Sequence, residues 1–224
     1  MIKNIIIIPY RDRTEHLKYW IQNSYPKLND KLDNLEVIIV EQSEDNKLFN
    51  RGKLLNIGYH YFNNEEYNYF THDIDHNPIN TNIYNNEIND SILSLKSGHI
   101  YSLGGIIKFK GSVFRKINGF RNDYWGWGIE DRDLFYRAKY YNINIIRNYD
   151  TKYKVLNHKH MLNQINRKKS YICNKIFNSK NKKNIEKFIL DSGLNNLEYK
   201  ILKTTPFILN DNVIDNIKTI TVKI

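Results

Sequence analysis

The sequence predicts an α/β fold built on a mostly parallel central sheet. Three short apolar runs, at residues 5–8, 37–40 and 69–71, have the composition of strands that are covered on both faces. Segments with helical spacing of apolar residues lie between them, so the chain alternates strand, helix, strand, helix, strand. Ligands of such sheets bind beyond the carboxyl ends of the strands, and we expect the functional site there.

The two helices between these strands have recognisable starts. Thr14 is a plausible N-cap for the first helix, and Pro26 is expected to close it. The second helix is expected to follow Arg51-Gly52.

The rest of the chain is less regular. Residues 77–97 are rich in Asn and predict a variable surface excursion with no assigned function. The remaining expected segments are extended chain over 101–109, interrupted by Gly104-Gly105, a helix over 131–141, a strand over 143–146, a Lys-rich helical stretch beyond Arg167 and an alternating tail over 213–224.

Composition indicates one globular domain over residues 1–224. The 41% hydrophobic content is enough to bury a core. Within this domain we distinguish a metal and loop region at about 150–170 and a basic C-terminal segment at about 167–224. The formal net charge of +10 favours an anionic partner, but it does not choose among a nucleotide diphosphate, an acidic glycan, nucleic acid and a lipid headgroup.

The sequence contains neither a disulfide pair nor a membrane signal. Cys173 is the only cysteine, and we expect a buried, inert thiol. No stretch reaches the ~20 apolar residues of a membrane span, and the apolar N-terminus has no cleavage site. We therefore expect a soluble chain with no signal peptide and no membrane span, located in the cytoplasm.

Two pairs of residues have the spacing of metal ligands. Asp73 and Asp75 follow the third predicted strand, where period-two alternation would project both carboxylates to one side, although a solvated turn is the more common explanation for such a pair taken alone. His158 and His160 share the spacing and, alone, are also compatible with a plain surface segment. Two imidazoles with a carboxylate suit Mn²⁺ better than Ca²⁺.

Residues 125–131, WGWGIED, are the most informative segment. Two Trp interleaved with Gly combine stacking surfaces with backbone freedom, as in a sugar platform or a moving lid. Glu130 and Asp131 fall in the first turn of a predicted helix, where the macrodipole favours an ionised carboxylate that could accept a proton from a hydroxyl. The alternative is an aromatic core corner followed by acidic residues that merely complement the helix terminus.

Six motifs follow one another along the chain: IIIPYRDR at 6–13, FNRGKLLNIGY at 49–59, HDID at 72–75, LGG at 103–105, INGF at 117–120 and YWGWGIEDRD at 124–133. In this order of motifs the chain resembles the β-1,4-galactosyltransferase family (glycosyltransferase family 7). The resemblance is strong over residues 3–160. TKYKVLNHKH at 151–160 and SGLNNLEYKI at 192–201 are most similar to the branch that galactosylates xylose on proteoglycan linkers. The resemblance implies a nucleotide-sugar-binding, Rossmann-like (GT-A type) single domain with a mostly parallel central sheet.

The resemblance also implies a role for each matching residue. The matches are Pro9, Tyr10, Arg11, Arg13, Phe49 and Arg51 for uridine and phosphate; Asp73, Gly104 and Gly105 for the rest of the donor site; Asp75, His158 and His160 for the Mn²⁺ ligands; Trp127 for the mobile-loop tryptophan; Glu130 for the acceptor carboxylate; and Asp131 for the catalytic base. The implied reaction is an inverting transfer of galactose or N-acetylgalactosamine from a UDP-sugar to a glycan hydroxyl.

The sequence departs from the family in three respects. Arg132 stands where many members carry another acidic residue, which leaves the acceptor open. Ser102 aligns with an aromatic residue that favours galactose over N-acetylgalactosamine, although a one-residue shift would place Tyr101 there. We also expect a chain without the cysteines, stem and anchor of secretory-pathway members, which argues against ordinary residence in the Golgi.

Two other functions compete with the enzyme. A UDP- or carbohydrate-binding module without catalysis would keep the fold, but it would not need Glu130 and Asp131 together with the metal ligands. A basic nucleic-acid-binding protein could use residues 167–200, but acidic residues interrupt that stretch and no nucleic-acid-binding motif appears. We expect no nucleic-acid partner; the oligomeric state stays open.

Overall fold

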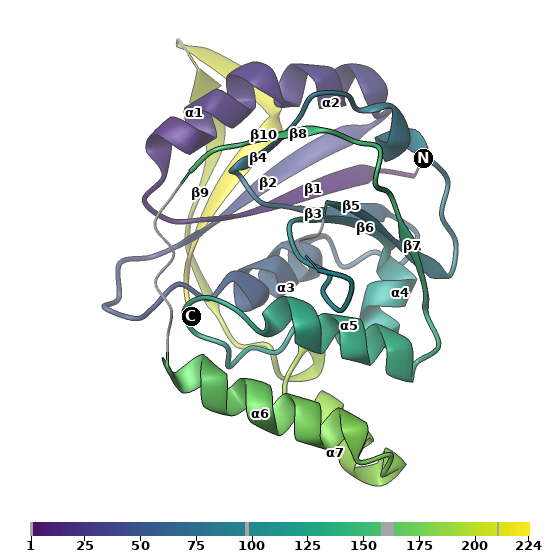
Figure 1. Cartoon of the computed structure of the whole chain (residues 1–224). Helices are drawn as coiled ribbons and strands as arrows, with labels where there is room; N and C mark the ends of the chain where they lie inside the picture. The colour runs from purple at the N-terminus through teal and green to yellow at the C-terminus, as the bar shows by residue number, and fades with distance from the viewer. Residues whose placement is uncertain (1, 97–98, 158–163, 210) are drawn as a thin grey trace.

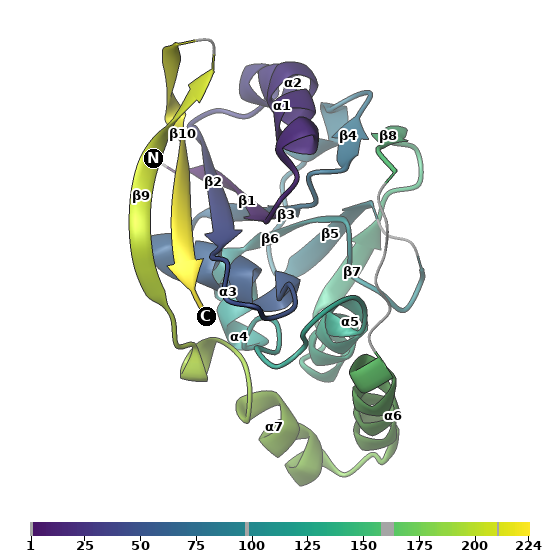
Figure 2. The same cartoon turned by 90° about the vertical axis from the view of Figure 1, so that its left-hand side faces the viewer.

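An eight-stranded mixed sheet forms the centre of the protein, and helices lie on both of its faces (Figures 1 and 2). The computed structural model describes residues 2–96, 99–157, 164–209 and 211–224. The strands lie side by side in the order β7-β5-β6-β3-β1-β2-β10-β9. Their bounds are β1 Asn4–Tyr10, β2 Leu35–Gln42, β3 Asn68–His72, β5 Ser91–Lys96, β6 Ile106–Lys110, β7 Asn144–Arg147, β9 Lys200–Leu209 and β10 Asn212–Lys223.

Parallel pairing dominates the middle of the sheet. β1 runs parallel to both β2 and β3, so Ile7 lies between Ile38 and Thr71. β10 is parallel to β2, and β7 is parallel to β5. β6 is antiparallel to β3 and β5, and β9 is antiparallel to β10. This arrangement confirms the predicted α/β class with a mostly parallel sheet.

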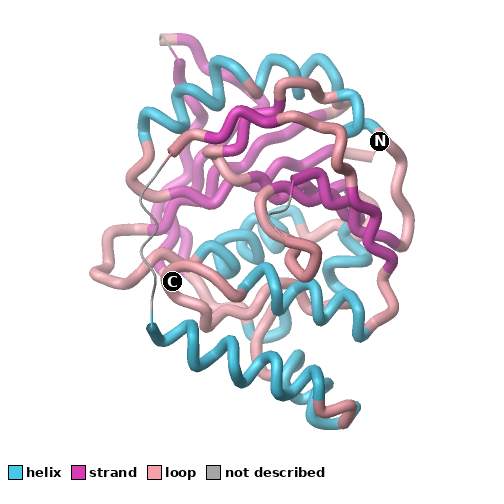
Figure 3. Tube along the Cα trace, viewed as in Figure 1, coloured by secondary structure: helices cyan, strands magenta, loops and turns pink. Residues whose placement is uncertain are grey.

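Each face of the sheet has its own apolar core because neighbouring side chains of β1 point in opposite directions. Ile6 and Ile8 pack with Trp20 on one face, whereas Ile5 and Ile7 pack on the other. Figure 3 shows helices above and below the strands. On the first face lie α1 Thr14–Asn23 and α2 Tyr25–Lys31, and on the second lie α3 Arg51–Phe62, α4 Gly111–Lys116 and α5 Glu130–Tyr140.

Two further helices form an outer layer beyond α5 (Figures 1 and 2). They are α6 Gln164–Asn178 and α7 Lys182–Leu190. The short strands β4 His76–Pro78 and β8 Tyr153–Val155 make a second, two-stranded sheet, and the 3₁₀ turns are η1 Asn82–Asn85 and η2 Leu194–Asn196. In the ranges described, no helix has the length and apolar character needed to cross a bilayer.

The start and end of the first helix differ from the prediction. Arg13, not Thr14, occupies the N-cap of α1, and no side chain caps this helix. The helix ends at Asn23, and Pro26 lies in the first turn of α2 instead of closing α1. Proline is tolerated there because the first turn of a helix does not need its N–H groups for internal hydrogen bonds.

The prediction of a surface excursion over 77–97 is wrong, because Tyr84 is fully buried and the C-terminal part of this segment forms a strand of the central sheet. β5 lies there as an internal strand between β6 and β7, and Ile92, Leu93 and Leu95 are almost fully buried. Ser91 and Ser94 are buried as well. Because of these two serines, the sequence lacks the continuous apolar run that is typical of a strand covered on both faces.

Candidate active site

The candidate site lies where β1 and β3 end and where α3 and α5 begin. Arg51 is the first residue of α3, and Glu130 is the first residue of α5. Asp73 directly follows β3. The two helix starts and the strand ends bring together side chains that are as many as 80 residues apart in sequence, and this is the edge of the sheet where the sequence placed the site.

Arg51 joins two carboxylates at the centre of the site. Its Nε donates to Asp73 Oδ1 at 2.6 Å, and its Nη1 donates to Asp131 Oδ1 at 2.8 Å. The guanidinium is almost fully buried. Burial opposes its charge, but the negative charges of Asp131 and Asp73 outweigh that effect and raise the pKa of Arg51. Arg51 therefore remains a cation that both carboxylates share.

The start of α3 is held in place by the asparagine that precedes Arg51. The Asn50 side chain accepts a hydrogen bond from Lys53 N at 3.0 Å, which caps the helix. Asn50 also donates through its backbone N–H to Gln42 Oε1 at 2.9 Å and through Nδ2 to Asn122 O at 2.7 Å. These bonds tie the position of Arg51 to the end of β2 and to the segment before the Trp residues.

Gly104 allows Asp131 to reach this position. A Cβ built on Gly104 would overlap the Asp131 carboxylate, so any larger residue would push the carboxylate away. The backbone supports the same approach, because Leu103 N donates to Asp131 O at 3.0 Å. The adjacent Gly105 has a φ of +71°, a conformation that glycine adopts without strain.

Asp73, Asp75 and His76 form a cluster of possible metal ligands. Each residue offers one ligand atom, and these atoms lie within 4.8 Å of one another. His76 Nδ1 is 3.6 Å from Asp75 Oδ1 and 3.9 Å from Asp73 Oδ2. The geometric reason given for the aspartate pair is wrong, because residues 73–75 form a turn, closed by His76 N donating to Asp73 O at 3.1 Å. The turn, not strand alternation, brings the carboxylates together.

The ligand atoms of this cluster fit the divalent cation that the family resemblance implies. Two carboxylate oxygens and one imidazole nitrogen are ligands for a borderline metal such as Mn²⁺, whereas Ca²⁺ takes oxygen alone. His76 Nδ1 is buried and has no hydrogen-bond partner among the residues described. Sequence reasoning missed His76, although its place directly after Asp75 was a visible signal.

His158 and His160, the other predicted metal ligands, lie outside the described residues. The described chain that leads toward them passes next to Asp75. β8 pairs with β4, and Leu156 N donates to Asp75 O at 2.9 Å.

Glu130 is buried and Asp131 is partly buried, and the pKa of both acids is raised, whereas the macrodipole at the helix start was expected to favour the ionised form. Burial, followed by the charge of Asp131, raises the pKa of Glu130 to about 8. Burial also raises the pKa of Asp131, although the Arg51 cation opposes this shift. A helix N-terminus contributes ~0.3–2 kcal/mol to a carboxylate, less than the several kcal/mol that loss of water costs an ion.

The segment that contains the two Trp residues, 125–128, precedes these acids in the chain, and we call it the Trp segment. Trp127 is half exposed, and Gly126 N donates to Phe49 O at 2.8 Å, which links the segment to the loop before α3. Gly126 and Gly128 have φ values of +84° and +96°. Ile129 also has a positive φ, 88°, and for a β-branched residue this is a strained conformation.

The predicted donor residues at the end of β1 lie in two environments. Pro9 and Tyr10 belong to β1, and the Tyr10 ring is buried. Arg11 leaves the strand, donates to Lys47 O at 2.9 Å and places its guanidinium 5.6 Å from the centre of the Phe49 ring. Arg13 lies at the start of α1. Arg11 and Phe49 are thus brought together, as the family resemblance implies.

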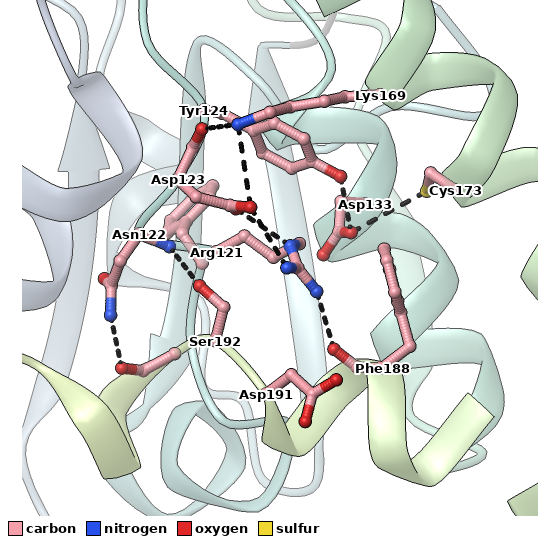
Figure 4. Close-up of polar contacts among 12 residues, drawn as sticks. Arg121, Asn122, Asp123, Tyr124, Asp133, Lys169, Cys173, Phe188, Asp191 and Ser192 are labelled. Carbon is pink, nitrogen blue, oxygen red and sulfur yellow. Dashed lines mark hydrogen bonds and ion pairs between the residues drawn. The ribbon is translucent and has the colours of Figure 1, made fainter. Parts of the chain in front are cut away.

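A second buried cluster, missed by sequence reasoning, lies one turn further along α5 (Figure 4). Asp133 and Arg137 are fully buried, and Arg137 Nε donates to Asp133 Oδ1 at 2.5 Å. Tyr124 OH and Cys173 Sγ both donate to Asp133 Oδ2, at 3.0 and 3.7 Å. Cys173 is buried, as predicted, and burial raises the pKa of its thiol.

This cluster attaches α6 and α7 to the segment that precedes the Trp residues. Lys169 of α6 bonds to Asp123 O and lies 3.6 Å from Asp123 Oδ2. Arg121 donates to both oxygens of Asp123 and to Phe188 O of α7 at 2.6 Å (Figure 4). Helices α6 and α7 therefore hold in place the residues that directly precede the Trp segment.

Comparisons with known proteins agree with this geometry. The profile described as the N-terminal region of glycosyl transferase group 7 matches residues 1–87, and the profile described as the N-terminal domain of galactosyltransferase matches residues 93–161. Beta-1,4-galactosyltransferase 1 of Bos taurus is 30% identical over 97% of this chain. The match covers 55% of that relative, so the chain spans about half of its length.

Two solved structures of Drosophila beta-1,4-galactosyltransferase 7 have the same fold. The catalytic domain in complex with xylobiose matches all of this chain and 94% of its own, with a TM-score of 0.78 and 23% identity. A mutant in complex with manganese, UDP-Gal and xylobiose matches the same shares, with a TM-score of 0.74 and 26% identity. The GT-A type of fold is thereby confirmed, and together with the two matching profiles these likenesses show that the chain belongs to the β-1,4-galactosyltransferase family, glycosyltransferase family 7.

Proposed function

We propose that this chain is an inverting, Mn²⁺-dependent glycosyltransferase that moves galactose from UDP-galactose to a glycan hydroxyl. The observation that carries the proposal is the Arg51 bridge. One guanidinium joins Asp73, at the metal-ligand cluster, to Asp131, the proposed base, at 2.6 and 2.8 Å. The leaving-group side and the acceptor side of the reaction are therefore parts of one site.

The metal-ligand cluster would hold the cation, and His158 and His160 remain proposed as further ligands. Bound Mn²⁺ would neutralise charge on the diphosphate as it departs. Arg11, with Phe49 beside it, is placed to bind the uridine diphosphate through charge and stacking. We assign Arg13 to the same part of the donor.

Asp131 is the proposed general base. The acceptor hydroxyl gives its proton to the Asp131 carboxylate while the acceptor oxygen bonds to the anomeric carbon. The bond from that carbon to the β-phosphate oxygen breaks on the opposite face, and UDP leaves with inversion. A pKa that burial raises toward the working pH suits a general base.

Glu130 and Trp127 are the proposed acceptor contacts. With a pKa of about 8, Glu130 is mostly a neutral acid at pH 7 and can donate a hydrogen bond to an acceptor oxygen. Trp127 is half exposed and offers an aromatic face to a sugar ring. Xylosides are the first acceptors to examine, because the similar Drosophila enzyme was crystallised with xylobiose.

The test is UDP release from a panel of UDP-sugars, with and without Mn²⁺ and with a xyloside acceptor. UDP-N-acetylgalactosamine belongs in the panel, because the resemblance aligns Ser102, or Tyr101 after a one-residue shift, with the aromatic residue that favours galactose. Asp131→Asn is expected to lower turnover by ~10²- to 10⁴-fold, the usual contribution of a general base, while UDP binding in the presence of Mn²⁺ changes little.

Asp90→Asn is the matched control, because Asp90 is exposed and directly precedes β5, at the opposite end of that strand from Lys96, which lies against Gly105. It is expected to leave turnover unchanged. Equal loss of turnover and UDP binding in Asp131→Asn would contradict the assigned base. UDP binding without turnover for any donor and any glycan acceptor would instead indicate a binding module.

A further inference from the structure

The positive charge of the protein is concentrated in its outermost layer. Residues 164–191, which hold α6 and α7, contain eight Lys and Arg residues but only two acidic residues, Glu186 and Asp191. This segment therefore supplies +6 of the formal net charge of +10. In Figures 1 and 2 the two helices form the end of the molecule farthest from α1 and α2.

Most of these cations are exposed and without acidic partners. Lys169 pairs with Asp123 and points inward. The others form no ion pair with any residue that the structure describes, although α7 itself carries one acidic side chain. They are Arg167, Lys168, Lys175, Lys180, Lys182, Lys183 and Lys187. Their charge is available to an external partner.

Apolar side chains lie among the cations on the outer side of α6. Tyr171 is 68% exposed and Ile172 is 40% exposed. Lys168, Tyr171, Ile172 and Lys175 have the i, i+3, i+4, i+7 spacing of one helix face, and Arg167 adjoins them. We call these five residues the cationic face of α6.

The opposite side of α6 is anchored to the body of the protein. Cys173 is fully buried against Asp133, and the Phe177 ring stacks on Tyr136 with centroids 5.1 Å apart. The buried side therefore fixes which residues face outward. The cationic face is presented by a helix held in place, not by a free tail.

We propose that the cationic face of α6 binds the surface of a membrane that contains anionic lipids. Lysine and arginine attract lipid phosphates and carboxylates, while a tyrosine and an isoleucine between them can enter the boundary of the acyl chains. A soluble polyanion would use the cations but would leave Ile172 in water. No described helix crosses a bilayer, so α6 would lie on the membrane surface.

The experiment is co-sedimentation of the full chain with phosphatidylcholine vesicles, with and without phosphatidylserine, at physiological salt. We expect binding only when phosphatidylserine is present. Lys168→Glu with Lys175→Glu is expected to weaken binding more than about twentyfold, since each cation near an anionic surface contributes about fivefold. Tyr171→Ser with Ile172→Ser is expected to weaken it about tenfold, through lost apolar burial.

Lys200→Glu with Lys203→Glu is the matched control. Both lysines are exposed on β9, outside α6 and α7, and this pair should bind vesicles like the native chain. Circular dichroism of each variant establishes that it is folded. Failure of the native chain to bind vesicles would overturn the proposal. So would a Tyr171/Ile172 variant that binds vesicles as well as the native chain and is retained on heparin or random oligonucleotides as strongly as the native chain. None of these outcomes depends on glycosyl transfer.

Discussion

Helix α5 carries two buried charged clusters, and they differ in how completely their polar atoms are paired. In the cluster around Arg137, the Asp133 carboxylate accepts from Arg137, Tyr124 and Cys173. Arg137 donates three further hydrogen bonds, to Asn118 O, Gly119 O and Ser192 O, at 2.8–3.2 Å. In the other cluster, where Arg51 of α3 lies beside the start of α5, Arg51 Nη2 and Glu130 Oε2 are buried without a hydrogen-bond partner in the described chain.

The difference separates structural from functional use of buried charge. A saturated cluster recovers the cost of removing ions from water and leaves no capacity for a ligand. Orphaned buried atoms cost stability in the free protein, and a ligand that pairs with them recovers this cost on binding. His76 Nδ1, also buried and unpaired in the described part of the chain, belongs to the same functional group.

The saturated cluster should fail structurally when one partner is removed. Arg137→Met leaves the Asp133 carboxylate buried without its cation, and we expect a loss of about 3–5 kcal/mol in the free energy of unfolding. Urea unfolding followed by circular dichroism measures it. Arg115→Met, which breaks the exposed pair with Glu65, should cost ~1 kcal/mol or less. Similar losses in both variants would remove the distinction.

A substitution in the cluster with unpaired buried atoms should change ligand affinity strongly and the free energy of unfolding only slightly. His76→Ala is expected to weaken Mn²⁺ binding by about 10- to 100-fold, the range found when groups around a metal site are removed. Calorimetric titration of Mn²⁺ in the presence of UDP measures this. His60→Ala is the control, because His60 is exposed and bonds to Tyr199. Unchanged affinity in His76→Ala would show that His76 is not a ligand.

The raised pKa of Glu130 predicts how stability depends on pH in the absence of metal and nucleotide. Its pKa of about 8 lies above the ordinary value of 4.5, so between these values the folded chain holds a proton that the unfolded chain has lost. This contribution to stability is complete below pH 4.5 and is lost as the pH rises through about 8.

Glu130→Gln should therefore flatten the fall in unfolding free energy between pH 5 and pH 8, a slope of up to ~1.4 kcal/mol per pH unit. Urea unfolding at a series of pH values measures it. Glu66→Gln, at an exposed position, should keep the native slope. A native slope in Glu130→Gln would place the titrating group elsewhere.

The smallest effect is expected at the strained residue between the Trp segment and α5. Ile129→Gly removes a positive-φ strain of ~1–3 kcal/mol but adds freedom to the unfolded chain, which costs ~0.5–1 kcal/mol. A net gain of about 1 kcal/mol in unfolding free energy should result. Asn142→Gly, at the other end of α5 with a φ of 54°, should change little because Asn tolerates this conformation. A loss of stability in Ile129→Gly would show that the lost burial of the partly exposed Ile129 side chain outweighs any relief of backbone strain.

The sequence predicted the parts of the fold that have strong local patterns. The runs that became β1, β2 and β3 were clear because both faces of each strand are covered, and α5 was clear from its apolar spacing. β5 was missed because Ser91 and Ser94 are buried there. Burial of a hydroxyl depends on neighbouring strands that are distant in the sequence.

The candidate site was predictable in its membership but not in its geometry. Motif order placed Asp73, Asp131 and Arg51 in one site, yet nothing local indicates that Arg51 bridges both carboxylates. The metal-ligand geometry was assigned to strand alternation, whereas a turn produces it and adds His76. The ionisation of Glu130 depends on burial by segments from several parts of the chain.

The parallel pairing of β10 with β2 has a consequence for how the chain is made. Thr221 bonds to Glu41 across 180 residues of sequence, and Ile220 pairs with Val40. During synthesis β2 is complete long before β10 leaves the ribosome, so its backbone is an open edge for most of that time. Contacts of such long sequence separation slow folding. Recombinant yield should therefore depend on protecting this edge, and slow translation at low temperature with abundant chaperones is the condition that favours it.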